Sequence, residues 1–270
     1  MRGRVLIIAG SDSGGGAGIQ ADIKTTTALE GYAATALTAL TAQNTQGVSG
    51  IEGVPPAFIE AQSDAVLTDI GADAVKTGML HAAPVIHAVV SALDHHAFRG
   101  PLVVDPVMYA KGGASLLADE ARQTLVEQLI PKATLLTPNI PEAEALSGMT
   151  IADEAQGLAA ARTLLSLGPQ AVLLKGGHLP AAEVVDLLVT AGAVGRFVHP
   201  RQATRHTHGT GCTLASAAAT GLAQGLDLEA AVGRAIAYVQ RALATAPGYG
   251  RGHGPLNHGH TVTPFPAPSP

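Results

Sequence analysis

The chain has 270 residues, of which 47% are hydrophobic and 14% are charged, and its formal net charge is −5. This composition can bury a large core, so it excludes a mainly disordered protein. A nucleic-acid-binding protein that depends on bulk positive charge is also disfavoured, because the 16 basic residues are scattered and the net charge is negative.

The N-terminal apolar run, residues 5–9, is too short for a signal core or a membrane span, and it predicts a buried strand instead. Cys212 is the only cysteine, which excludes an intrachain disulfide and fits a reducing cytoplasm. Neither a linker nor an internal repeat interrupts the chain. We therefore expect one domain over residues 1–270, with a Pro- and Gly-rich tail from about residue 247.

Short apolar runs alternate with helical stretches along the chain. The expected strands are 5–9, 33–39, 74–76, 102–104, 134–136 and 171–174, and the helices between them are 17–29, 57–68, 84–93, 119–129 and 155–167. A hairpin of 183–189 and 195–199 follows, and then two Ala-rich helices, 212–224 and 228–244. Strands without polar alternation are typical of a parallel sheet covered on both faces. The pattern predicts a doubly wound α/β fold, whose ligands bind beyond the carboxyl ends of the strands.

The first strand is followed by "GSDSGGGAGIQAD", residues 10–22. This segment fits neither the GxGxxG fingerprint nor a P-loop, because Ile19 stands where a glycine is needed and no Gly-Lys-Ser/Thr follows. It can be a strand–helix turn capped by Asp12 or Ser13. It can also be a loop whose glycines let a small molecule approach the backbone.

Polar residues also follow the second and third strands. Gln43 and Asn44, in "TAQNT", can present a donor and an acceptor to the edge of a heterocycle, or they can satisfy the backbone of a turn. "KTGML" places Met79 at the same rim, where it can serve packing or contact a ligand.

The next three strand ends carry the residues that suit a phosphate. Asp105 opens "DPVM", and Asn139 and Glu142 lie in "TPNIPEAE". They fit a magnesium-phosphate site, since Mg²⁺ takes few protein ligands, but Asn139 and Glu142 also fit a helix cap. Lys175, which closes the sixth strand before two glycines, is a plausible phosphate contact.

The segment "HTHGTGC", residues 206–212, precedes a run of small residues that opens a helix. The backbone amides of such a helix start form an anion-binding nest, and the same position favours a thiolate. Zinc is disfavoured, because the neighbouring histidines are spaced by two and no second cysteine exists. Cys212 can therefore be a packed core residue or part of an anion site.

The motifs together resemble the hydroxymethylpyrimidine/phosphomethylpyrimidine kinases of thiamin biosynthesis, which belong to the ribokinase superfamily. The resemblance extends from about residue 4 to about residue 258 and rests on "AGSDSGGGAGIQADIKT", "TALTAQNT", "KTGML", "DPVM", "TPNIPEAE", "LLKGGH", "THGTGCTLASA" and "GPLNH". It implies a ribokinase-like fold, with a central, mostly parallel sheet flanked by helices on both faces. It also implies that MgATP phosphorylates 4-amino-5-hydroxymethyl-2-methylpyrimidine and then its monophosphate.

The resemblance also implies a role for each matching position. Asp22 and Gln43 would bind the edge of the pyrimidine, and Gly10, Met79 and Val107 would line its pocket. Asp105, Asn139 and Glu142 would serve magnesium and the phosphates, and Lys175 and Thr210 would contact the phosphates of ATP. Gly209, Gly211 and Cys212 would form an anion hole, with Cys212 taking the hydroxymethyl proton.

We expect adenine to be bound by loop residues between 194 and 206 and by the helix after Leu228, and we expect residues 110–117 to form a flap. The family resemblance implies a cytoplasmic homodimer whose partners are small molecules, with neither nucleic acid nor membrane. Two other readings remain open. One is a pyridoxal-type kinase, and the other is a non-catalytic sensor that keeps the pyrimidine pocket.

Overall fold

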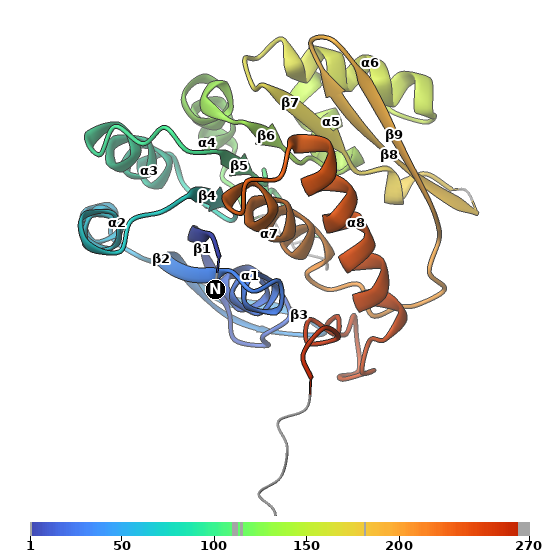
Figure 1. Cartoon of the computed structure of the whole chain (residues 1–270), viewed down its shortest axis with the longest axis horizontal. Helices are drawn as coiled ribbons and strands as arrows, with labels where there is room; N and C mark the ends of the chain where they lie inside the picture. The colour runs from blue at the N-terminus through green and yellow to red at the C-terminus, as the bar shows by residue number, and fades with distance from the viewer. Residues whose placement is uncertain (1, 110–112, 114–115, 181, 264–270) are drawn as a thin grey trace, which may run out of the picture.

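The computed structural model of the chain describes residues 2–109, 113, 116–180 and 182–263. Within these residues one nine-stranded sheet has the strand order β3-β2-β1-β4-β5-β6-β7-β8-β9 (Figure 1). The strands are β1 (Arg4–Asp12), β2 (Tyr32–Asn44), β3 (Gly47–Gly53), β4 (Ala74–Thr77), β5 (Leu102–Val104), β6 (Leu135–Leu136), β7 (Ala171–Leu174), β8 (Glu183–Thr190) and β9 (Val194–Pro200).

The centre of the sheet is parallel from β2 to β7, as the apolar strands predict. The antiparallel strands lie at its edges, where β3 pairs with β2, and β8 and β9 form the expected hairpin beside β7. β3 is absent from the sequence prediction, because its glycine-rich and largely exposed residues form no apolar run. The predicted α/β class and mostly parallel sheet are confirmed.

Helices cover both faces of the sheet (Figure 1). They are α1 (Gly18–Ala28), α2 (Pro56–Asp69), α3 (Ala83–His95), α4 (Asp119–Thr124), α5 (Ile140–Ser147), α6 (Glu154–Leu165), α7 (Thr210–Ala223) and α8 (Leu228–Ala244). One buried hydrophobic cluster joins the sheet to α1, α7 and α8, and a second joins it to α2 through α6. None of the helices in the described part of the chain is long and apolar enough to span a membrane.

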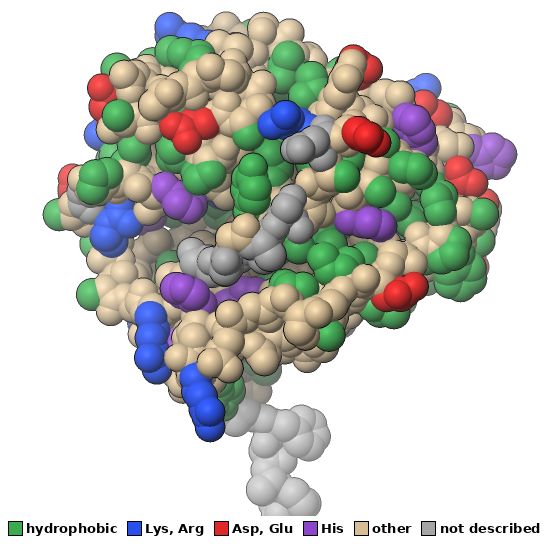
Figure 2. Space-filling model, turned by 180° about the vertical axis from the view of Figure 1, so that it is seen from behind, with side chains coloured by type: hydrophobic (Ala, Val, Ile, Leu, Met, Phe, Trp, Pro, Cys, Tyr) green, Lys and Arg blue, Asp and Glu red, His purple; other side chains and the backbone are tan. Residues whose placement is uncertain are grey.

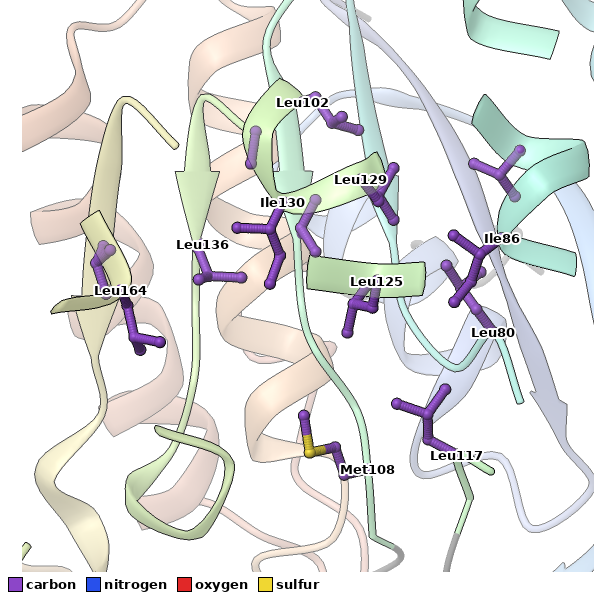
Figure 3. Close-up of a cluster of buried hydrophobic side chains, with 14 of the residues drawn as sticks. Leu80, Ile86, Leu102, Met108, Leu117, Leu125, Leu129, Ile130, Leu136 and Leu164 are labelled. Atoms are coloured by element: carbon purple, nitrogen blue, oxygen red, sulfur yellow. The ribbon is translucent and has the colours of Figure 1, made fainter. Parts of the chain in front are cut away.

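Strand β1 shows why the sheet needs both layers. Its consecutive residues point to opposite faces, so Leu6 and Ile8 join the cluster beneath α2 to α6, whereas Val5 and Ile7 join the one beneath α1, α7 and α8. All four side chains are fully buried. Figure 3 shows part of the first cluster, where leucine, isoleucine and methionine side chains from several elements meet.

Two helical segments differ from the sequence prediction. α5 was not predicted as a helix, although its start contains the Asn139–Glu142 cap that the sequence suggests. The helix predicted over 119–129 consists of α4 followed by a π-helical turn at Leu125–Leu129. The predicted flap, residues 110–117, lies mostly outside the described residues.

The segment after α8 contains neither helix nor strand as far as residue 263, in agreement with the predicted loop, but it is fixed to the fold. His258 is buried, and its Nε2 lies 3.0 Å from the hydroxyl oxygen of Thr213 on α7. The Tyr238 hydroxyl of α8 donates to the His258 carbonyl oxygen. The segment therefore joins the two C-terminal helices.

We predict that His258 makes the folded state sensitive to acid. Burial disfavours its charged form and lowers its pKa to about 4. As the pH falls below the ordinary histidine value of about 6.5, the unfolded chain takes up a proton that the folded protein does not. Stability should decrease by about 1.4 kcal/mol for each further pH unit, until the pH reaches the folded-state value.

Urea unfolding at pH 7.5 and pH 5 checks this prediction. The His258→Gln variant should lose less stability between these pH values than the original protein does. Substituting His95, an exposed histidine of α3, by glutamine supplies the matched control and should leave the difference unchanged. Equal pH dependence in the original protein and the His258 variant would contradict the prediction.

Candidate active site

A cavity of about 610 Å³ lies at the carboxyl ends of the central strands, where the sequence places its polar residues. It is lined at successive strand ends by Asp12, Gln43, Met79, Asp105 and Lys175. The face shown in Figure 2 is hollowed, and histidine side chains lie around the hollow. The cavity extends from there along the start of α7 to the side of α8.

The loop after β1 is held by the carboxylate of Asp12. One oxygen accepts from the Gly14 amide at 2.8 Å, and the other accepts from the amides of Gly16 and Ala17 at 3.0 and 2.9 Å. Nε2 of His208 lies 2.8 Å from that second oxygen. Burial would raise the pKa of Asp12, but the hydrogen bonds from His208 and from the loop amides lower it below its usual value.

The loop after β1 and the start of α7 approach each other with no space between their backbones. Gly209 has a φ of +85°, and a Cβ atom there would lie 1.8 Å from the carbonyl oxygen of Gly16. A Cβ at Gly16 would lie 2.5 Å from the His208 ring. Both glycines are therefore required for this contact, which brings the turn after β1 to the phosphate-binding residues predicted at α7.

The start of α7 forms the predicted anion nest. Its first intrahelical hydrogen bond runs from the Thr213 amide to the Gly209 carbonyl, so helix geometry leaves the amides of Gly211 and Cys212 without intrahelical acceptors. A Cβ at Gly211 would lie 3.2 Å from Nζ of Lys175, so the amides and this ammonium share one site. The Thr210 side chain lines the same cavity, and its hydroxyl donates to the carbonyl of Thr207.

Cys212 is partly exposed in the cavity. Burial disfavours the charged form of its sulfur, whereas the backbone amide of Gly18, at the start of α1, favours it. Burial raises the pKa of the thiol to about 12, while the nearby ammonium of Lys76 acts in the opposite direction. The uncomplexed protein therefore holds a protonated thiol at neutral pH.

A lysine and two carboxylates lie at the other side of the nest. Nζ of Lys175 is 3.0 Å from Oδ1 of Asp105 and 4.0 Å from Oε2 of Glu142. The Thr137 hydroxyl donates to the same oxygen of Asp105 at 3.1 Å. Burial raises the pKa of Glu142 to about 7, and although Lys175 opposes this, the negative charge of Asp105 adds to it.

Of the two roles that the sequence left open for Asn139 and Glu142, the structure confirms the helix cap. They form a capping box, since each side chain accepts a hydrogen bond from the backbone amide of the other. Both residues also line the cavity. The described residues contain no group of three or more histidine, cysteine, aspartate or glutamate side chains that could enclose a metal. The pair Asp105 and Glu142 suits Mg²⁺, which uses one or two carboxylates together with substrate phosphates.

The opposite end of the cavity offers a side-chain amide. The Thr41 hydroxyl has two acceptors within reach, the Ser11 carbonyl at 2.9 Å and Oε1 of Gln43 at 3.0 Å. Nε2 of Gln43 lies 3.4 Å from Nε2 of His208, and both residues line the cavity. Met79 and Val107 line this end, and a Cβ at Gly10 would lie 3.2 Å from the Met79 sulfur. Five residues were expected around a heterocycle. Four of them therefore meet here, namely Gly10, Gln43, Met79 and Val107.

Asp22 lies elsewhere. It is fully buried and is not among the residues that line the cavity. One oxygen accepts from the Lys76 ammonium at 2.8 Å, and the other accepts from the Ser216 hydroxyl at 2.6 Å. The pyrimidine contact inferred from the resemblance does not follow from this geometry, because Asp22 is separated from the cavity by the residues that line it.

Three further cavity residues were not predicted as site residues. His208 was considered only as a zinc ligand, and Lys76 and Thr41 were not considered separately. No spacing signal could have paired His208 with Asp12, because 196 residues separate them. Lys76 could have been noticed as a lysine inside an apolar strand, since an ammonium there requires a buried partner.

A family of known proteins matches the part of the chain that contains most of the cavity residues. The family model described as phosphomethylpyrimidine kinase matches residues 12–257. The chain belongs to the phosphomethylpyrimidine kinase family. It is therefore a phosphotransferase, and the fold expected from the resemblance is confirmed.

The kinase is 58% identical over 257 residues to the thiamine biosynthesis bifunctional protein ThiED of Geobacter sulfurreducens, covering 95% of the chain but 52% of that protein. The chain thus spans about half the length of this relative. It is 48% identical to the hydroxymethylpyrimidine/phosphomethylpyrimidine kinase of Bacillus subtilis, with 94% of each chain covered. Among solved structures, an ADP complex of Bacillus subtilis pyridoxal kinase is similar with a TM-score of 0.89 and 35% identity, covering 96% of this chain and 98% of that one.

We predict that Gly209→Ala impairs the kinase by separating the two loops. The new Cβ would overlap the Gly16 carbonyl, so the start of α7 with its nest must move away from the turn after β1. Gly225 provides a matched control, because its φ is also +85° and nothing lies within 4 Å of a Cβ there. Gly225→Ala should cost only about 1 kcal/mol of left-handed backbone strain.

Thermal unfolding and steady-state kinetics of the two variants test this explanation. Gly209→Ala should lose more stability than Gly225→Ala and should also lose activity at least about tenfold, the result expected when reacting groups are misplaced. Identical behaviour of the two variants would show that the close contact is not required.

Proposed function

We propose that the kinase uses ATP to phosphorylate 4-amino-5-hydroxymethyl-2-methylpyrimidine, and then phosphorylates the monophosphate to the diphosphate, in thiamin biosynthesis. The observation that carries this proposal is one continuous cavity. It joins the carboxamide of Gln43 to a helix-start nest at Gly211 and Cys212 and to the ammonium of Lys175.

The end of the cavity at Gln43 suits a 4-aminopyrimidine. The NH₂ group of Gln43 has two hydrogens, so beside its contact with His208 it can donate one of them to a ring nitrogen. Met79 and Val107 supply apolar surface for the ring and its methyl group, and Gly10 allows the ring to approach the backbone. The hydroxymethyl group would then extend toward Cys212.

The opposite end suits ATP. Lys175 and Thr210 lie beside the nest, where they can contact the transferred phosphate, and Asn139 lies next to them. The region expected to hold adenine also lines the cavity, through Pro200, Arg201 and Gln202 and through Ile236, Val239, Gln240 and Leu243 of α8. Asp105 and Glu142 would hold Mg²⁺, which neutralises phosphate charge when bound.

The two phosphorylations place different demands on the residues around Cys212. In the first, the Cys212 thiol must lose its own proton to solvent before it can act as a base. The hydroxymethyl oxygen then attacks the terminal phosphorus, the bond to the ADP oxygen breaks, and the hydroxyl proton passes to the thiolate sulfur. In the second, the attacking oxygen belongs to a phosphomonoester. Because its second pKa is about 6, it is already ionised and needs no base. The nest and Lys175 would stabilise the charge of the transferred group in both.

Pyridoxal is the second candidate substrate. The similarity to the Bacillus subtilis pyridoxal kinase structure favours it, since that fold serves another heterocyclic alcohol. A donor at Gln43 suits a ring nitrogen, which both heterocycles contain. The curated relative at 48% identity, named hydroxymethylpyrimidine/phosphomethylpyrimidine kinase, favours the aminopyrimidine instead. The homodimer and the cytoplasmic location implied by the resemblance stay predictions.

Turnover of the purified protein tests the proposal. MgATP should be consumed with the hydroxymethylpyrimidine and with its monophosphate, and mass spectrometry should show the monophosphate and then the diphosphate. A much higher kcat/KM for pyridoxal than for the pyrimidine would favour the second candidate. No turnover with any of the three substrates would refute both.

We predict that Cys212→Ala reduces the first phosphorylation by about 10²–10⁴-fold, the contribution typical of a general base. The second phosphorylation should fall far less, because its nucleophile carries no proton that must be removed. Separate single-turnover measurements with the two substrates check this difference. Equal losses in the two steps would reduce Cys212 to a residue that only supports the nest.

We predict that Gln43→Ala weakens binding of the pyrimidine by roughly tenfold, as expected for one lost hydrogen bond, and leaves ATP binding unchanged. Calorimetric titration with each ligand measures both effects. The control is Gln46→Ala, which removes an exposed glutamine of the same connection. Unaltered pyrimidine affinity in the Gln43 variant would remove this residue from the pocket.

A further inference from the structure

A ladder of polar pairs runs along the contact between α1 and α7. Successive members of each helix are four residues apart, so they lie on one face. The pairs are Gly18 with Cys212, Asp22 with Ser216, and Thr26 with Thr220. The thiol of Cys212 is thus one turn away from a buried hydrogen bond between Ser216 and Asp22.

Lys76 joins this ladder from β4. It is fully buried, and its ammonium lies 2.8 Å from the Asp22 carboxylate. Among the described residues, Asp22 is its one hydrogen-bond partner, although an ammonium carries three N–H donors. A buried ammonium with two donors to spare is costly unless another anion or a ligand approaches it.

The location of Lys76 indicates what that anion is. Lys76 and Cys212 line the same cavity. Burial would lower the pKa of Lys76, but the neighbouring carboxylate of Asp22 opposes this and holds the pKa above its usual value. The other charged groups that act on Cys212 are Asp105, at the end of β5, and Lys175, after β7. Burial and the carboxylates of Asp22 and Asp105 raise the pKa of the thiol. Lys76 is the neighbouring cation that acts most strongly to lower this pKa.

We propose that Lys76 is the counter-ion of the Cys212 thiolate, and that its buried ammonium stabilises the charged sulfur that accepts the hydroxyl proton of the substrate. Asp22 and Ser216 hold the ammonium at the ladder. Because Asp22 also neutralises part of its charge, Asp22 limits how far the ammonium can stabilise the thiolate. The inference rests on the proposed role of Cys212 as the base in the first phosphorylation.

The thiol of the resting protein is protonated, so it first releases its proton to solvent and leaves a thiolate whose charge Lys76 stabilises. The thiolate accepts the hydroxymethyl proton as the oxygen forms its bond to the terminal phosphorus and the bond to the ADP oxygen breaks. The resulting thiol then releases that proton to solvent, which restores the thiolate. Lys76 keeps its three protons throughout, so it stabilises charge and transfers no proton.

Alkylation of the thiol by iodoacetamide measures this effect directly, because Cys212 is the only cysteine and is partly exposed. The rate follows the thiolate fraction, which changes tenfold for about one unit of pKa. The double variant Lys76→Met/Asp22→Leu removes both charges and leaves neither unpaired. Its alkylation at pH 8.5 should be slower by on the order of tenfold, because the cation has the larger influence.

The variant Asp22→Asn should act in the opposite direction. It keeps the ammonium and removes the carboxylate, so the thiolate becomes the nearest anion and alkylation should be faster than in the original protein. Lys76→Arg should restore most of the rate that the double variant loses. Thr220→Val breaks the next pair of the ladder without changing a charge and should leave the rate unchanged.

The decisive result is an alkylation rate that falls in Lys76→Met/Asp22→Leu and rises in Asp22→Asn. If the two side chains had only a structural role, the rate would change in the same direction in both variants. An alkylation profile that is unchanged in the double variant, or slower in Asp22→Asn, would overturn the inference. The first phosphorylation should show the same shift in its pH–rate profile, whereas the second should not. If Cys212→Ala harms both phosphorylations equally, the proposed base fails, and the alkylation experiment still decides whether Lys76 controls the thiol.

Discussion

The contact between Lys76 and Asp22 links the parts of the kinase that form its cavity. Lys76 comes from β4, which leads directly to Met79, and Asp22 lies one turn after the start of α1. Ser216 adds α7, whose first turn carries the nest. Three elements that are distant in sequence are therefore fixed by one carboxylate, and a buried pair of this kind is strongly destabilised when either charge is removed alone.

A second buried contact, between Asp12 and His208, joins the turn after β1 to the start of α7. Asp12 gathers the amides of the turn after β1 and accepts from His208, while the glycine at 209 lets the two backbones touch. The loop after β1 and the start of α7 are thus held together at the cavity. Phosphoryl transfer depends mainly on positioning and charge stabilisation, and under the proposed function this contact would supply the positioning.

Sequence reasoning succeeded where the signal was local. Apolar runs predicted the central strands, and the rule that ligands meet carboxyl strand ends placed Gln43, Asp105 and Lys175 at one edge. It failed for β3, which has no apolar run. The contact between Asp22 and Lys76 could not be predicted from the sequence either, because two residues that are 54 positions apart form no recognisable spacing pattern. A resemblance transfers roles by position, so it assigned Asp22 to the substrate without showing that this side chain is fully buried and does not line the cavity.

A double-mutant cycle on the free energy of unfolding tests most directly whether the Lys76–Asp22 contact holds the site together. Lys76→Met and Asp22→Leu should each destabilise the kinase by about 3–5 kcal/mol, because each leaves one buried charge unpaired. Combined, they should cost much less than the sum of the two, since neither charge then remains. Additive losses would contradict this account, because they would mean that the two side chains contribute independently.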